Sequence, residues 1–338
     1  MIGVAKLTMI IYDKYVSMDI IQKQKYIKFI KDRFERRLAK ELNLLRVSAP
    51  LLVTPESGLQ DNLSGIERRV SFDIKKDGKE LEIVQSLAKW KRLALGKYGF
   101  HLHKGIYTDM TAIRRDDKID ETHSIYVDQW DWEKVISRKD RTLDYLKDTV
   151  RKIVNAIKDT STLVENKGFK SVNIENNVFF ITSQELLDLY PNKTDKEREY
   201  EIVKKYKTVF IIGIGDDLSN GLPHDSRAPD YDDWCLNGDL LFYHEVLDIA
   251  LEISSMGIRV DKKSLLYQLE KSKKTERLEL DYHKKIINEE LPLTIGGGIG
   301  QSRLCMLLLG RVHIGEVQAS YWDKETLEFV KKNNIELL

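Results

Sequence analysis

Apolar residues follow a helical period near the start of the chain. From Ser17 to Phe34, isoleucine, tyrosine and phenylalanine recur every three or four residues among many charges, which predicts a helix with one apolar face. The next stretch, 46–53, predicts a strand that carries Pro50, and a proline within a strand favours an edge or an interface. We therefore expect this helix to pack against another surface.

The rest of the chain mixes short strands with helices. Residues 70–74 and 81–84 flank Asp77-Gly78, the turn signal of a β-hairpin. The other predicted elements are a helix over 86–97, strands over 105–113 and 123–132, a charged helix over 139–167, a strand over 178–182, helices over 184–189 and 195–205, a strand over 209–214, a loop over 221–234, strands over 239–243 and 250–260, and helices to about 289. Strands grouped in hairpins, with helices between them, indicate an α+β fold with a central antiparallel sheet flanked by helices.

A glycine run at 296–300 is expected to open a final helix that ends near 309. It matches neither the dinucleotide fingerprint nor a P-loop, because no Lys-Ser or Lys-Thr follows it. A dinucleotide-binding fold is therefore not the first choice.

The amino-acid composition argues against several classes of protein. Lys plus Arg total 55 against 54 Asp plus Glu, so the chain lacks the excess positive charge of a general nucleic-acid binder. The two cysteines, Cys235 and Cys305, are too few for a disulfide framework or a four-ligand zinc site. No apolar run approaches the roughly 20 residues that cross a bilayer. We expect a soluble cytoplasmic protein with neither a nucleic-acid nor a membrane partner.

Three constellations carry the chemistry. The first is the predicted helix followed by Val-Ser-Ala-Pro, ending at Pro50; the second is Ile-Arg-Arg-Asp at 113–116, a loop, and Tyr-Val-Asp-Gln-Trp-Asp-Trp-Glu at 126–133; the third is Gly-Ile-Gly-Gln-Ser-Arg, ending at Arg303. In this order they resemble the three motifs of class II aminoacyl-tRNA synthetases: a proline at the dimer interface, an arginine motif that holds the α-phosphate and adenine of ATP, and a glycine-arginine motif that closes on ATP.

The whole chain is more closely similar to one family, the ammonia-dependent asparagine synthetases, or aspartate–ammonia ligases. The segments that carry this resemblance are 60–65, 86–92, 127–133, 227–234, 237–239, 254–261 and 294–304. The family shares the class II core but lacks an anticodon-binding domain, and only about 18 residues precede the first motif here. The resemblance implies a single class II synthetase-like catalytic domain over 1–338, which forms a homodimer.

The resemblance also implies a reaction. ATP activates the side-chain carboxylate of L-aspartate to β-aspartyl-AMP, and ammonia displaces AMP to give L-asparagine, AMP and diphosphate. A carboxylate is a poor electrophile, so the adenylate provides the leaving group, and the protein must hold two anions together while neutralising the α-phosphate. ATP is thus a substrate, and Mg²⁺ is the expected metal.

The ATP-binding residues follow from the motifs. Arg114 would clamp the α-phosphate, Arg303 would bind ATP from the other side, and Asp116 would lie near the adenine, with Gly300 and Glu252 as further contacts. Each charged residue could instead be a solvated surface group, which is the ordinary case for a lone arginine. Among acidic residues that could bind Mg²⁺, which prefers oxygen ligands, Glu252 comes first, followed by Asp239 and Asp232.

The strand at 126–133 offers two faces. Gln129 and Asp131 are two apart, so they project from one face, while Asp128, Trp130 and Trp132 project from the other. We assign Gln129 to the aspartate or adenylate and Asp131 to the substrate ammonium group; the alternative is a solvent-facing polar stripe. The two tryptophans are expected in the core.

The remaining substrate residues come from three segments. By resemblance, Arg259 would hold the α-carboxylate and Lys91 would be the second cation of that clamp, with Ser86 and Ser255 beside the substrate. Lys91 could instead be an exposed helix lysine. Asp61 would contact the substrate amino group and help to receive ammonium, or it could simply cap a turn. Asp61, Arg114 and Arg303 are the expected catalytic residues.

Two departures limit the transfer, because many family members carry Gly-Lys where this chain has Asp216-Asp217 and His where it has Gln85. His123 and His224 lack a telling partner and are interpreted as structural or loop residues. Two alternatives stay open. One is a truncated aspartyl- or asparaginyl-tRNA synthetase relative that loads another acceptor; the other is a non-catalytic paralogue, which should have lost an ATP arginine.

Overall fold

An eight-stranded sheet organises the computed structural model, which describes residues 18–338 except 64, 170–173 and 176. Its strands are β1 (Leu44–Arg46), β5 (Gly105–Ile113), β6 (Tyr126–Val135), β7 (Phe179–Thr182), β8 (Thr208–Ile212), β9 (Asp232–His244), β10 (Ile249–Arg259) and β11 (Thr294–Gly300). Their order is β1-β5-β6-β11-β10-β9-β8-β7. Pairing is antiparallel from β5 across to β8, whereas β1 with β5 and β7 with β8 pair parallel at the two edges.

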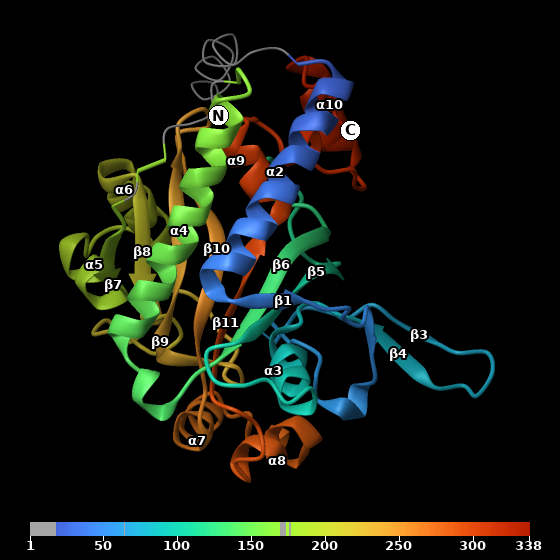
Figure 1. The fold of residues 1–338 in the computed structure, drawn as a ribbon, viewed down its shortest axis with the longest axis vertical. Coiled ribbons are helices and arrows are strands. Elements are labelled where there is room, and N and C mark those ends of the chain that lie inside the picture. Colours follow the sequence, from blue (N-terminus) through green and yellow to red (C-terminus); the bar gives the residue numbers. More distant parts are fainter. Residues whose placement is uncertain (1–17, 64, 170–173, 176) are drawn as a thin grey trace.

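Two long helices cover one face of this sheet. Figure 1 shows α2 (Ile20–Leu42) and α4 (Leu143–Glu165) side by side across it. The helix α2 begins at Ile20, where Asp19 accepts a hydrogen bond from the backbone N–H of Gln22 at 2.8 Å; the expected start at Ser17 lies outside the described residues. Its apolar side is buried, and Phe34 packs on Trp130 with ring centroids 4.7 Å apart. The expected packing of this face is confirmed, and it takes place within the chain itself.

The other elements surround the sheet. They are β2 (Leu52–Val53), β3 (Ser71–Asp73) and β4 (Glu80–Ile83), which form a small second sheet, the helices α3 (Ala88–Lys97), α5 (Ser183–Leu189), α6 (Asp195–Tyr206), α7 (Lys262–Lys271), α8 (Asp281–Ile287), α9 (Gln301–Leu308) and α10 (Lys324–Lys332), and the 3₁₀ turns η1 (Pro55–Ser57), η2 (Arg138–Asp140), η3 (Thr275–Glu279) and η4 (Ile314–Glu316). The α+β expectation is confirmed, with a mixed rather than purely antiparallel central sheet.

Three local predictions were wrong. The strand expected over 46–53 is split, because β1 joins the large sheet and β2 the small one, and Pro50 lies between them in neither. The glycine run leads directly into the expected helix, α9, but it is itself strand β11, and α9 is not the final helix because α10 follows it. The expected loop over 221–234 ends early, since β9 already begins at Asp232.

Strand β11 requires glycine because side chains of the neighbouring strands fill the space where its own side chains would lie. A Cβ on Gly296 would overlap the Glu133 carboxylate and would lie 2.6 Å from Nη2 of Arg259. A Cβ on Gly298 would overlap the side-chain amide of Gln129. Polar side chains from β6 and β10 therefore occupy this face, and only glycine leaves room for them.

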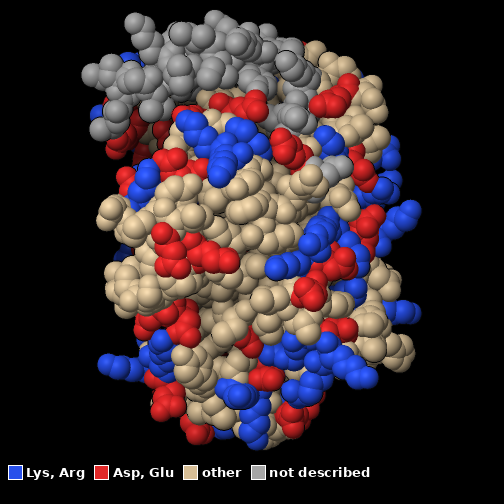
Figure 2. Space-filling view, turned by 90° about the vertical axis from the view of Figure 1, so that its left-hand side faces the viewer, with Lys and Arg blue, Asp and Glu red and all other residues tan. Residues whose placement is uncertain are grey.

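Charges on the molecular surface are mixed. Figure 2 shows lysines and arginines interspersed with acidic residues on one side of the molecule. Among the described residues, no helix combines the length and apolar composition required to span a bilayer.

Candidate active site

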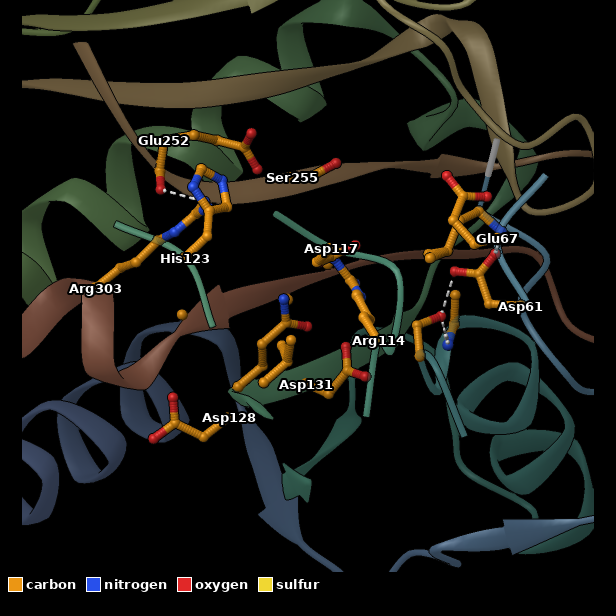
Figure 3. Close-up of a pocket in the computed structure, with 18 of the residues that line it drawn as sticks. Asp61, Glu67, Arg114, Asp117, His123, Asp128, Asp131, Glu252, Ser255 and Arg303 are labelled. Atoms are coloured by element: carbon orange, nitrogen blue, oxygen red, sulfur yellow. Dashed lines mark hydrogen bonds between the residues drawn. The ribbon is translucent and has the colours of Figure 1, made fainter. Parts of the chain in front are cut away.

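A pocket opens on the face of the sheet opposite α2. Trp130 and Trp132 are fully buried on the α2 side of β6, as expected, so the alternate residues Gln129 and Asp131 face the other way, into the pocket. It is lined by every residue that the sequence assigned to the site except Asp239: Asp61, Ser86, Lys91, Arg114, Asp116, Gln129, Asp131, Asp232, Glu252, Ser255, Arg259, Gly300 and Arg303. Figure 3 shows how several of these side chains converge.

Buried ion pairs form the floor of the pocket. Arg259 donates from Nε and Nη2 to Glu133, at 3.0 Å and 2.7 Å to the nearest oxygens, and from Nη1 to Asp232. Lys91 donates to Asp131 and, at 3.1 Å, to the carbonyl of Gly297. The alternative interpretation of Lys91 as an exposed helix lysine is therefore wrong.

Burial and ion pairing shift the pKa values of the two cations in this floor, Lys91 and Arg259. Burial lowers the pKa of Lys91, and the Asp131 carboxylate offsets only part of that effect. Burial would also lower the pKa of Arg259, but Glu133 and Asp232 outweigh it and raise that pKa well above its ordinary value. The Arg259 guanidinium thus stays charged in a buried position.

Asp61 serves two purposes in its loop. Its Oδ1 accepts from the backbone N–H of Leu63 at 2.8 Å, which is the turn-capping bond, and its Oδ2 accepts from the Ser86 hydroxyl at 2.6 Å. The carboxylate is buried at the pocket wall. The turn-capping alternative and the placement at the site are therefore both true of this residue.

A buried cluster behind the wall holds the segments that carry Asp61 and Asp232. Oδ2 of Asp230 lies 2.8 Å from Nζ of Lys89 and 3.0 Å from Nε2 of His283. Lys89 also donates to the carbonyl of Gln60, 2.9 Å away. One carboxylate thus ties the two loops to α3 and α8.

The two expected ATP arginines are held only by backbone oxygens. Arg114 donates from Nε to the carbonyl of Gln85 at 3.3 Å. Arg303 donates to the carbonyls of Glu252 and Thr122, at 3.1 Å and 3.4 Å. Within the part of the chain that the structure describes, neither guanidinium forms a salt bridge, so both retain donors for an anionic ligand.

Asp116 lies at the rim of the pocket, where Arg68 holds it. The Arg68 backbone N–H donates to its Oδ2 at 2.7 Å, and the Arg68 guanidinium pairs with both oxygens. These bonds lower the pKa of Asp116 to about 2. His123, expected to be structural, borders the pocket beside Asp120, with Nδ1 and Oδ1 2.8 Å apart.

The three metal candidates have different surroundings. Asp232 is bound by Arg259, and both oxygens of Asp239 lie 2.7 Å from Nη2 of Arg227. Burial and the Glu252 carboxylate raise the pKa of Asp239 to about 6, although Arg227 lowers it. Across the described residues, no three His, Cys, Asp or Glu side chains gather as a ready metal site. Of the three, Glu252 and Asp232 line the pocket, and the carboxylate of Glu252 has no arginine partner among the described residues.

Two site residues were missed. Arg227 lines the pocket and donates to the Ser255 hydroxyl at 2.6 Å; its only signal was its place in a segment that resembles the family. Glu133 carries Arg259, and it continues the alternation of Gln129 and Asp131 along one face of β6. The period of the strand could have identified it.

Sequence comparisons relate the chain to known proteins. The sequence model of a family described as aspartate–ammonia ligase matches residues 21–334. A relative from Ruminiclostridium cellulolyticum, named aspartate–ammonia ligase, is 54% identical over 325 residues, which cover 95% of this chain and 96% of that protein. A relative of the same name from Fusobacterium nucleatum is 56% identical over 323 residues, which cover 95% of this chain and 98% of that protein.

Solved structures give the fold. An Entamoeba histolytica asparaginyl-tRNA synthetase in complex with asparaginyl-adenylate superposes with a TM-score of 0.67 at 12% identity, over 90% of this chain and 68% of that one. The Pyrococcus horikoshii asparaginyl-tRNA synthetase with asparaginyl-adenylate gives 0.61 at 17% identity, over 88% and 68%. At such identities the likeness is one of fold, and it confirms the class II synthetase-like core.

Proposed function

The chain belongs to the aspartate–ammonia ligase family, and we propose that the pocket over β6, β10 and β11 is where it makes L-asparagine from L-aspartate, ammonia and ATP. The observation that carries this assignment is the contrast among the pocket's arginines. Arg227 and Arg259 are bound by carboxylates, whereas Arg114 and Arg303 keep donors for phosphate.

L-Aspartate would lie on the ion-paired floor. Arg259 and Lys91 take its α-carboxylate, Asp131 takes its ammonium group, and Gln129 contacts the side chain that becomes the adenylate. Ser86 and Ser255 flank these positions. The buried pairs that fix the cations support this assignment, because a preorganised clamp does not have to reorganise when the substrate binds.

ATP would enter between Arg114 and Arg303, which form no salt bridge with any described residue. Arg114 binds the α-phosphate, Arg303 binds from the opposite side along with Gly300, and Asp116 lies toward the adenine. A side-chain oxygen of aspartate attacks the α-phosphorus, and the bond to diphosphate breaks. The two guanidinium groups stabilise the charge that develops on the α-phosphate.

Ammonia then attacks the activated carbonyl carbon, and AMP leaves with the carboxylate oxygen. The nitrogen loses a proton as the amide forms. Asp61 is the proposed acceptor, since its carboxylate is buried in the pocket wall and held by Ser86.

Mg²⁺ fits best at Glu252 together with Asp239. The two residues lie on neighbouring strands, and their mutual repulsion is one of the effects that raise the pKa of Asp239; a cation would relieve it. Bound Mg²⁺ supplies neutralising charge to the ATP phosphates. Asp239 and Asp232 are each paired with an arginine, so Glu252 is the first candidate, and Asp239 ranks above Asp232 only because it repels Glu252.

The proposal extends to the whole chain. We infer that residues 1–338 include a single catalytic domain, which acts on free aspartate rather than on tRNA and forms a homodimer. Cys235 and Cys305 are both free thiols, which supports a location in the reducing cytoplasm.

The test is an assay of products. The protein is incubated with aspartate, ATP, Mg²⁺ and ammonium chloride, and asparagine, AMP, ADP and diphosphate are quantified. We expect asparagine with equal AMP and diphosphate, lost in Arg114→Ala and retained in Arg115→Ala, because the adjacent Arg115 is exposed and lies outside the pocket. Diphosphate exchange without asparagine would favour an acceptor such as tRNA, and no ATP turnover would favour a non-catalytic paralogue.

A further inference from the structure

We propose that Asp128 of β6 is a positioning residue for the ATP-binding Arg303, and that Lys31 of α2 sustains it in that role. The inference rests on the proposed function, because it takes Arg303 as an ATP ligand. Asp128 and Ser302 lie at the edge of the pocket, and Asp128 projects from the face of β6 opposite to Gln129 and Asp131. Figure 3 shows the Asp128 carboxylate directed away from Asp131 and Arg114.

The start of α9 needs an acceptor that its own sequence does not provide. The first N–H groups of a helix have no partner within the helix, and a side chain at the N-cap usually accepts from them. The N-cap here is Gly300, which has no side chain. A Cβ at this position would already lie 3.3 Å from Cβ of Arg303, so a capping serine or aspartate would crowd the arginine.

Asp128 supplies the missing cap from a neighbouring strand. Its Oδ1 accepts from the backbone N–H of Ser302 at 3.1 Å, and its Oδ2 accepts from the Ser302 hydroxyl at 2.8 Å. A carboxylate at a helix N-terminus also interacts favourably with the helix dipole. Both bonds fix the residue directly before Arg303, and so the first turn of α9.

The orientation of that turn decides where the Arg303 guanidinium lies. Two backbone carbonyls, those of Glu252 and Thr122, are the hydrogen-bond acceptors of Arg303 within the described part of the chain. Both acceptors are neutral, and the Asp117 carboxylate interacts with Arg303 through its charge but forms no salt bridge with it in the described structure. The direction in which Arg303 leaves α9 therefore depends on the cap made by Asp128.

The Asp128 carboxylate is itself held by a buried network. Gln318 donates from Nε2 to Asp128 at 3.3 Å and to the Ser302 hydroxyl at 3.2 Å, and its Oε1 accepts from Ser124 at 2.6 Å. Nζ of Lys31 lies 3.0 Å from Oδ2 of Asp128. The carboxylate side chain is only 10% exposed, so this cation offsets the cost of keeping it ionised.

The ion pair with Asp128 also changes the pKa of Lys31. Burial would lower its pKa, but the Asp128 carboxylate outweighs that and raises the pKa of Lys31 above its ordinary value. Lys31 does not line the pocket. A residue of α2 is thereby coupled, through one carboxylate, to the turn that presents an arginine to ATP.

Steady-state kinetics of asparagine formation test this chain of contacts. Asp128→Asn keeps an acceptor but loses the charge, and we expect it to raise the KM for ATP about tenfold while the KM for aspartate changes less than about twofold. Lys31→Met should raise the KM for ATP about threefold. Lys28→Met is the matched control, since Lys28 lies on the same helix, is 75% exposed and pairs with Asp32; it should change neither constant.

The split between the two KM values separates positioning from general damage, which would raise both. Equal rises in both KM values, an unchanged KM for ATP in Asp128→Asn, or the same effect from Lys28→Met as from Lys31→Met would overturn the inference. If Asp128→Asn does not fold, Ser302→Ala removes one of the two capping bonds, and an unchanged KM for ATP in that variant would overturn it.

Arg303→Ala distinguishes the inference from its premise. A normal KM for ATP in Arg303→Ala would remove the premise, and the inference with it. An impaired Arg303→Ala beside an unaffected Asp128→Asn would overturn the inference alone and leave the proposed function standing.

Discussion

Four arginines line the pocket, and their contacts divide them into two kinds. Arg227 and Arg259 are fixed by carboxylates, whereas Arg114 and Arg303 are tethered only by carbonyls within the described residues. A fixed arginine selects a ligand by shape, while a tethered one can follow charge as it moves during the reaction. The first kind suits the small, invariant aspartate, and the second suits the α-phosphate.

Replacement of Arg259 tests the first kind. Arg259→Lys cannot span Glu133 and Asp232 with one ammonium group, so we expect the KM for aspartate to rise at least about tenfold. The KM for ATP should change little. Arg303→Lys is the matched comparison and should reverse the pattern. Equal effects of Arg259→Lys on both substrates would contradict the assignment of Arg259 to aspartate.

The raised pKa of Asp239 leads to a prediction of how Mg²⁺ binding depends on pH. Its pKa is raised to about 6, so the folded protein holds this proton more tightly than an ordinary carboxyl does. Because Mg²⁺ binds the ionised form, its affinity should fall as the pH drops through about 6. From about pH 7.5 to about pH 5, we expect the Mg²⁺ requirement for asparagine synthesis to rise about tenfold.

Asp239→Asn removes this titrating group and should flatten the pH dependence of the Mg²⁺ requirement. Asp77→Asn, at the exposed tip of the β3–β4 hairpin, is the control and should keep the slope. A slope that persists in Asp239→Asn would show that another group sets it, and would remove Asp239 from the metal site.

The sequence predicted which residues line the pocket better than it predicted which of them pair with one another. The period of a strand placed Gln129 and Asp131 on one face, and both side chains line the pocket. Pairing joins residues that lie far apart in the chain, such as Glu133 and Arg259. No local pattern encodes such contacts, so the pairing of Glu133 with Arg259 and the partners of Asp232 and Asp239 were not foreseen.

Among the elements, β11 differs most from its prediction. Glycine has little intrinsic preference for strands, so the four glycines in the run 294–300 provided no local strand signal. The strand forms because β6 and β10 pair with it on either side. The side chains of Glu133 and Gln129 then fill the space that side chains of β11 would otherwise need.

A methyl group in this strand should therefore be costly. Gly296→Ala would push against the Glu133 carboxylate and Arg259, and we expect about 3 kcal/mol of lost stability in urea unfolding together with a raised KM for aspartate. Gly78→Ala is the control. A Cβ there meets nothing within 4 Å, so it should cost only the backbone penalty of a positive φ, about 1 kcal/mol. Similar losses in both variants would contradict the packing argument.

For the whole molecule, the fold class could be predicted from the sequence, but the strand order could not. Hairpin turns and periodicity located most helices and strands within a few residues. The sheet order joins β6 to β11 and β1 to β5, which are separated by long stretches of chain. Such pairings depend on tertiary contacts, and only the resemblance to class II synthetases anticipated the architecture.

The proposed homodimer depends on what the fold leaves uncovered. The apolar side of α2 is buried in the chain's own core, so the segment from β1 to β2, with Leu45 60% and Leu51 47% exposed, is the expected contact. Sedimentation should give twice the 39.4 kDa chain mass. Leu51→Glu should yield monomers by burying a charge in the interface, whereas Leu189→Glu, on α5 and 58% exposed, should leave the dimer intact. A monomeric wild type, or dissociation by both variants, would rule out this interface.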